Sequence, residues 1–247
     1  MTSPFFLFAN VLLLLRLPLL LGDRPARARG WALKAVLQCL VLVSFRGLGP
    51  VWALGLGVLI LNGVAAYWDT RRGDRASGHL VLGLFELVLA SICLSPAWGV
   101  ELRAGWMDFA GALGSWSALG ALPGLFLERD ASIVLFGLLL AANEANLFIR
   151  WALGRLHLKP GFDVTPRLDP QEYNRGRVIG LIERVLIFAF VFGGQYGAVG
   201  FTLAAKGFTR FKELENRSFA EYVLIGTLLS SALAMLAALL AKRLAGI

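Results

Sequence analysis

Long hydrophobic runs alternate along the chain with short polar stretches that are rich in Arg and Lys. A helix needs about 20 apolar residues to cross the hydrocarbon core of a bilayer, and most of these runs approach that length. The pattern therefore predicts an all-α fold, a polytopic transmembrane bundle of seven or eight helices. The predicted spans are residues 5–21, 31–45, 51–67, 79–94, 132–151, 178–205 and 220–241.

An eighth run, residues 106–127, is rich in Gly, Ala, Ser and Trp, so it either crosses as a tightly packed helix or re-enters without crossing. With eight crossings, the basic residues divide almost evenly between the two sides, 10 against 11; with seven crossings they divide 14 against 7. Cytoplasmic loops carry an excess of Lys and Arg. Seven crossings are therefore favoured, with the N-terminus outside and residues 150–177 and the C-terminus in the cytoplasm.

Composition supports a chain that is solvated by lipid. Hydrophobic residues make up 57% of the 247 residues and charged residues 16%, with a mean hydropathy of +0.70. In soluble domains, about 45–50% of residues are apolar and about 25% are charged. This excludes soluble, disordered and fibrous proteins. We expect one integrated membrane domain with an N-terminal half, residues 1–130, and a C-terminal half, residues 131–247.

The net charge of +8 comes mainly from basic residues between the hydrophobic runs. In those positions they orient helices and meet anionic lipid headgroups, so membrane lipids are the expected partners and nucleic acid is not. A homo-oligomer or a membrane partner protein is left open. The expected location is the bacterial inner membrane.

Motifs for phosphate binding, metalloprotease chemistry, redox cysteines and serine hydrolysis are absent. His79 and His157 lie far apart in sequence and are expected at membrane interfaces, and run 31–45, which contains Lys34 and Gln38, is expected to lie partly in the interface. We therefore expect no metal and no cofactor, and a non-enzymatic role is favoured. Two cysteines inside hydrophobic runs are expected to be free thiols: Cys39 and Cys93.

Polar residues inside two C-terminal runs are the first candidate site. Asn143, Asn146 and Arg150 have the spacing i, i+3, i+7, which places them on one helical face, and Glu144 lies beside that face. The next run begins with the adjacent charges Glu183 and Arg184. Intramembrane charges are costly and are usually paired or functional. We expect Glu183 to pair with Arg150 and Arg184 with Glu144, either as a ligand site or as clamps between helices.

A second candidate is the segment 206–221, where charges spaced 3, 4 and 4 residues apart fall on one face of a helix. It is either a solvated stalk or a gating or headgroup-binding elbow. The aligned charges are Arg210, Glu213, Arg217 and Glu221, and Lys206 precedes them. Small residues spaced four apart predict close helix packing, with Gln195 bonding across to a neighbour. These small residues are Gly193, Gly197, Gly200 and Ala204, and Gly120 and Gly124 in the eighth run.

The C-terminal stretches "IGLIER", "AAK…RF" and "AEYVLIGTLLS", between Asn143 and Ser230, resemble domain-of-unknown-function family 3307 of bacterial multi-pass membrane proteins. The N-terminal half is divergent. Members of that family carry recurring His and Asp residues in the first four helices; here Asp23 and Asp69 stand at matching places, without a matching His. The resemblance therefore implies topology, and the loss of any metal or hydrolytic site of that family.

Three functions remain open at this point. The first is transport or channel-like handling of a small charged solute or a lipid headgroup by the intramembrane polar cluster. The second is a non-catalytic assembly or partner subunit, in which the cluster only holds helices together. The third is a degenerate intramembrane enzyme acting on lipid.

Overall fold

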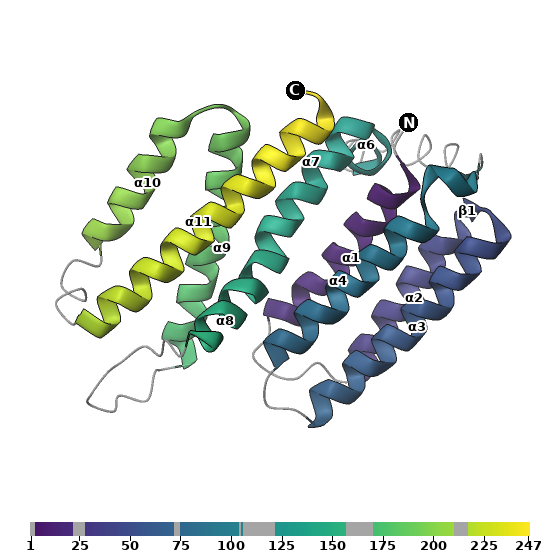
Figure 1. Ribbon diagram of the computed structural model, residues 1–247, viewed down its shortest axis with the longest axis horizontal. Coiled ribbons are helices and arrows are strands. Elements are labelled where there is room, and N and C mark those ends of the chain that lie inside the picture. The colour runs from purple at the N-terminus through teal and green to yellow at the C-terminus, as the bar shows by residue number, and fades with distance from the viewer. Residues whose placement is uncertain are drawn as a thin grey trace. The chain divides into compact units, whose positions relative to one another are not determined.

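The computed structural model describes residues 3–21, 28–71, 75–103, 105, 122–156, 170–209 and 217–247, and these are mostly helical, as the sequence predicts. The chain divides into two compact units, residues 1–139 and 140–247 (Figure 1). The helices of the first unit are α1 (Pro4–Leu21), α2 (Ala28–Val43), α3 (Leu48–Arg71), α4 (Arg75–Cys93), the short η1 (Pro96–Trp98), α6 (Leu122–Leu127) and α7 (Arg129–Leu139). Those of the second are the π-helical turn η2 (Leu140–Glu144), α8 (Ala145–Arg155), α9 (Pro170–Phe192), α10 (Tyr196–Thr209) and α11 (Arg217–Ala245).

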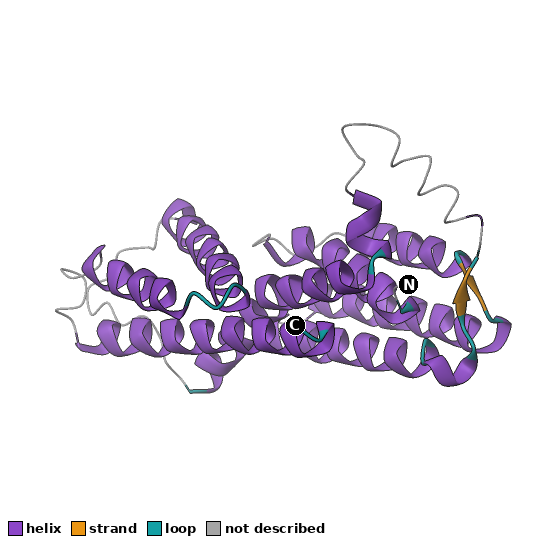
Figure 2. Cartoon of the chain, turned by 90° about the horizontal axis from the view of Figure 1, so that it is seen from above, coloured by secondary structure: helices purple, strands orange, loops and turns teal. Residues whose placement is uncertain are grey.

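The first unit is built around four helices. Short connections make successive helices neighbours. Helix α1 contacts α2 and α4, and α3 contacts the same two helices, so the four helices close a ring (Figure 1). Helices α6 and α7 pack against α1, where Asn10 Nδ2 donates to the Ser132 carbonyl at 2.9 Å. At one end, β1 (Phe45–Arg46) pairs antiparallel with β2 (Glu101–Leu102), the two strands drawn in orange in Figure 2.

The four-helix ring has polar residues inside and large apolar residues outside. On α2, Lys34 and Gln38 are buried, whereas Leu33 and Leu40 are 60% and 57% exposed. Helices α3 and α4 follow the same rule. The outward apolar residues of α3 and α4 include Trp52, Leu56, Leu59, Ile60, Leu84, Phe85 and Ile92. This arrangement suits a helix bundle surrounded by lipid, because such an apolar exterior would be a liability in water.

Three helices of the described chain are long and apolar enough to cross a membrane, and they are Gly49–Asp69, Arg129–Arg155 and Ala220–Ala245. Pro4–Leu17 and Gly78–Cys93 are shorter apolar helices. These elements are compatible with a membrane protein. Residues 106–121 of the eighth predicted run lie outside the described residues, and Leu122–Leu127 forms α6.

The single span predicted at residues 178–205 is wrong. The run is divided between α9 and α10, which pack against each other as a helical hairpin (Figure 1). Helix α9 ends because Gly194 adopts a positive φ of 73° and the Gln195 N–H donates to the Phe190 carbonyl at 2.7 Å, the geometry that ends a helix with a left-handed glycine. Hydropathy continues through these residues and does not reveal the turn.

Candidate functional site

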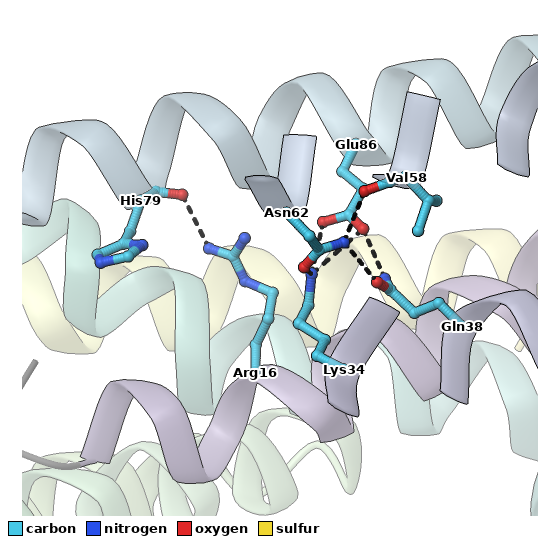
Figure 3. Close-up of polar contacts among 7 residues, drawn as sticks. All are labelled: Arg16, Lys34, Gln38, Val58, Asn62, His79 and Glu86. Atoms are coloured by element: carbon cyan, nitrogen blue, oxygen red, sulfur yellow. Dashed lines mark hydrogen bonds and ion pairs between the residues drawn. The ribbon is translucent and has the colours of Figure 1, made fainter. Parts of the chain in front are cut away.

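A network of buried polar side chains fills the interior of the four-helix ring (Figure 3). Lys34 Nζ lies 3.0 Å from Glu86 Oε2 and donates to Asn62 Oδ1 at 2.9 Å. Gln38 Nε2 donates to Glu86 Oε1, and Asn62 Nδ2 donates to Gln38 Oε1 at 2.9 Å. All four residues are at most 4% exposed. One ion pair and two amides from α2, α3 and α4 thus satisfy one another.

A second ion pair lies nearer one end of the same helices. His79 Nε2 and Asp69 Oδ1 are 2.8 Å apart, and Trp31 Nε1 donates to Asp69 Oδ2 at 2.9 Å. The Trp31 indole stacks on the His79 ring with 5.3 Å between the ring centroids. Lys34 Nζ lies 5.6 Å from the Trp31 ring centroid, so the indole lies between the two ion pairs. A cation over an aromatic face is attracted by the ring quadrupole.

We call these residues the polar row, because helical spacing puts them in line. Asn62 and Asp69 on α3, like His79 and Glu86 on α4, are seven residues apart, which is two turns or about 10 Å along each helix. The residues of the polar row are Trp31, Lys34, Gln38, Asn62, Asp69, His79 and Glu86. The two ion pairs therefore occupy two levels of the ring.

Helix α1 contributes an arginine beside the polar row. Arg16 is 2% exposed, and its Nη2 donates to the His79 carbonyl at 2.9 Å (Figure 3). The guanidinium lies against α4 at Gly83, where an added Cβ would come within 2.5 Å of Arg16 Cζ. Glycine at this position therefore makes room for the cation.

Sequence reasoning missed the polar row. It interpreted Lys34, Gln38 and His79 as interface residues and found no histidine partner for Asp69, whereas His79 is bonded to that carboxylate. Asp23, the other aspartate of that argument, lies outside the described residues, as does His157. A signal was available, because three successive helices each carry polar residues seven apart, as Trp31 and Gln38 do on α2.

The predicted C-terminal cluster is only partly brought together. Asn143 is buried in η2, Glu144 and Asn146 are half-buried, and Arg150 is exposed. Arg184 is 4% exposed, and its Nη2 donates to the Ala142 carbonyl in η2 at 3.3 Å. Arg184 thus bonds to the backbone two residues before Glu144, its predicted partner. A π-helical turn is typical of positions under functional or packing constraint.

Glu183 does not pair with Arg150. It forms an ion pair with Lys206, which joins α9 to α10 across the hairpin. Both side chains are largely buried, and they line a cavity of about 210 Å³ together with Thr202. The prediction of a partner on the 143–150 helix was wrong because it assumed one straight span, in which residues 183 and 206 would be about 35 Å apart.

The remaining predicted residues are spread over the second unit. Arg217 Nε lies 3.0 Å from Glu221 Oε1, and this i, i+4 pair is exposed. Arg210 and Glu213 lie outside the described residues, so one helix over 206–221 stays a prediction. Gln195 is exposed in the turn before α10.

The predicted small-residue contacts are not formed within the described chain. No atom lies within 4 Å of a Cβ added to Gly197 or Gly200, and Gly193 and Ala204 are exposed. Gly120 lies outside the described residues, and the surroundings of Gly124 are not described.

The described residues hold no group of three or more His, Cys, Asp or Glu side chains that could bind a metal ion. The paired side chains of the polar row are able to exchange hydrogen bonds and protons with their neighbours. No family model, no curated protein and no solved structure matches the chain, so the likeness to domain-of-unknown-function family 3307 stays a prediction.

Proposed function

We propose that the protein is a multi-pass transport protein of the bacterial inner membrane, in which the polar row exchanges protons during transport of a small charged solute. The observation that carries this proposal is the burial of two acid–base pairs, Lys34–Glu86 and His79–Asp69, inside one ring of apolar helices. Ionisable residues inside membrane bundles are costly, and they mark proton relays and ion pathways.

The pairing supports proton exchange in particular. A proton that passes from Lys34 to Glu86, or from His79 to Asp69, turns a charged pair into a neutral one without changing the net charge of the interior. The low dielectric penalises net charge much more than it penalises a neutral pair. Each pair can therefore change state in place when a helix moves or water enters.

A non-catalytic membrane subunit is the second candidate. The specific observation in its favour is that Gln38, Asn62, Lys34 and Glu86 satisfy one another at close range. A fully satisfied polar network rigidifies a bundle and specifies one packing. In this case the polar row would fix the order of the helices and move no proton.

A double substitution separates the two candidates. Removing one member of a buried pair costs about 3–5 kcal/mol, while replacing both by apolar residues of similar volume is often neutral. We expect Lys34→Met/Glu86→Met, which leaves Asn62 and Gln38 bonded to each other, to stay folded in detergent and to lose proton movement in proteoliposomes that report internal pH with a trapped dye. Glu128→Gln, which alters an exposed carboxylate of the same unit, is the control and should keep the flux.

The single variant Glu86→Gln should unfold at a lower temperature than the double variant, because it leaves Lys34 buried without its counter-charge. A folded Lys34→Met/Glu86→Met protein with unchanged proton movement would refute transport through the polar row. A proton permeability no higher than that of empty vesicles, in the unchanged protein as well, would favour the subunit.

A further inference from the structure

A groove runs along the outside of the four-helix ring between α2 and α3, with a cavity of about 720 Å³. Its walls are apolar and include Val43, Leu56 and Leu59, whose side chains are 61%, 62% and 53% exposed. Gly55 forms part of the lining, and the nearest atom to a Cβ added there is Leu42 Cδ1 at 3.6 Å. The volume is in the usual range of binding sites for small molecules.

Two arginines stand at the end of this groove that adjoins the strands. Arg46 pairs with Glu101 in the β1–β2 ladder, and the Arg103 N–H donates to the Ser44 carbonyl at 2.9 Å. This register places the side chains of Arg46, Glu101 and Arg103 on the same face of the ladder, with the two arginines diagonal to each other. Both arginines line the groove and are exposed. Among the described residues, neither guanidinium has a hydrogen bond or an ion pair.

The groove therefore combines an apolar channel with a cationic mouth. Trp52 lines it as well and is 73% exposed; aromatic side chains of this kind are enriched where a membrane protein meets the headgroup region. Guanidinium groups bind phosphate oxygens in a bidentate manner. They are also weakly hydrated, which suits them to the headgroup region of a membrane. An acyl chain fits the apolar walls, and a phosphate complements the two positive charges.

We propose that this groove binds one anionic phospholipid, with an acyl chain along α2 and α3 and its phosphate held between Arg46 and Arg103. The groove is on the outside of the ring and shares no residue with the polar row. The proposal therefore requires insertion in a membrane and does not depend on proton movement.

Brominated lipids test the proposal, because bromine quenches a tryptophan that it touches. The full chain is reconstituted in vesicles of phosphatidylcholine that contain either dibrominated phosphatidylglycerol or dibrominated phosphatidylcholine. The Trp52 signal is the difference between the chain and its Trp52→Phe variant. We expect the anionic lipid to be preferred at Trp52 by about 25-fold, since each of the two arginines favours an anionic lipid by about fivefold.

Four variants locate the preference. Arg46→Gln/Arg103→Gln should reduce it to about twofold or less, while Arg155→Gln/Arg243→Gln, which removes two exposed arginines elsewhere, should leave it unchanged. Arg46→Lys/Arg103→Lys should retain most of the preference for the anionic lipid. If the glutamine variant does not fold, a loss of the preference in this lysine variant would contradict the proposal. Gly55→Leu keeps both arginines and fills the groove, so Trp52 quenching by phosphatidylglycerol should fall.

Two results would overturn the proposal. An equal preference in the Arg46→Gln/Arg103→Gln and Arg155→Gln/Arg243→Gln variants would mean that the attraction is a property of the whole surface. No quenching of Trp52 by either brominated lipid would mean that protein, and not lipid, covers the groove.

Discussion

At the scale of single residues, this protein buries groups that soluble proteins keep at the surface. Lys34 and Arg16 are 3% and 2% exposed, and each is bonded to atoms on another helix. A buried cation retains its charge only where carboxylates or carbonyl oxygens replace its hydration shell. The side chains around each cation are therefore constrained as closely as the cation itself, and Gly83 is the clearest example.

We predict that Gly83→Ala destabilises the first unit by about 1–3 kcal/mol, because the added methyl group overlaps the Arg16 guanidinium, which is bonded to the His79 carbonyl. Thermal unfolding in detergent measures the change. Gly63→Ala on α3 is the matched control. No atom lies within 4 Å of its added Cβ, and alanine is favoured over glycine in a helix by up to about 1 kcal/mol. Equal melting temperatures for the two variants would contradict the prediction.

At the scale of helices, the hairpin of α9 and α10 depends on one turn and one ion pair. Gly194 supplies the left-handed conformation that closes α9, and Lys242 Nζ on α11 donates to the Phe192 carbonyl at 3.4 Å beside it. A basic side chain at this position compensates the unsatisfied carbonyls and the negative end of the helix dipole. Farther along the two helices, Glu183 and Lys206 join them again.

Gly194→Ala should destabilise the protein by about 1 kcal/mol, since a residue with a Cβ is strained at a φ of 73°. Gly197→Ala, three residues later within α10, should be neutral or stabilising, because its φ is not positive and the space around it is open. The two melting temperatures, measured side by side, check this prediction. A loss in Gly197→Ala as large as that in Gly194→Ala would show that the turn is not where the structure places it.

A double-mutant cycle tests the ion pair of the hairpin. We expect Glu183→Gln and Lys206→Gln to be coupled by about 0.5–3 kcal/mol, because both side chains are largely buried and in direct contact. Glu183→Gln and Arg150→Gln should be additive, since Arg150 is exposed and forms no pair with Glu183 in the described residues. The reverse result would restore the pairing that the sequence alone suggests.

At the scale of the whole molecule, the hairpin changes the topology that the sequence indicates. In a membrane, a single span over residues 178–205 would place its two ends on opposite sides, whereas a hairpin of α9 and α10 would return the chain to the side from which it came. We then expect the basic residues before α9 and after α10 to share one side of the membrane. Hydropathy and charge counting do not distinguish these arrangements, because both depend only on where the runs begin and end.

Cysteines placed at exposed glycines should report this topology. In a Cys39→Ala/Cys93→Ala background, Gly176→Cys before the apolar part of α9 and Gly207→Cys in α10 should react with an impermeant maleimide from the same side of the membrane. Ile247→Cys, beyond the candidate span Ala220–Ala245, should react from the opposite side and serves as the control. Labelling of positions 176 and 207 from opposite sides would reinstate the single span.

The sequence predicted what depends on local patterns: helical structure and long apolar helices. It did not predict correctly which side chains pair with each other across different helices. The sequence pattern paired Glu183 with Arg150, whereas the turn at Gly194 brings Lys206 to Glu183. Glu86 and Asn62 attracted no interpretation, because a single polar residue in a hydrophobic run has no visible partner until the neighbouring helices are in place. The spacing of seven residues between polar positions on three helices did indicate that these side chains meet.

The ion pair between Lys34 and Glu86 also bears on how the chain enters the bilayer during synthesis. Lys34 leaves the ribosome 52 residues before Glu86, and a lone lysine at the centre of an inserting helix costs about 2.5–3.5 kcal/mol. Helix α2 is therefore expected to wait at the lateral gate of the insertion machinery until α3 and α4 have emerged. We expect the three helices to enter lipid together, and a chain truncated after α3 to leave α2 outside the membrane core.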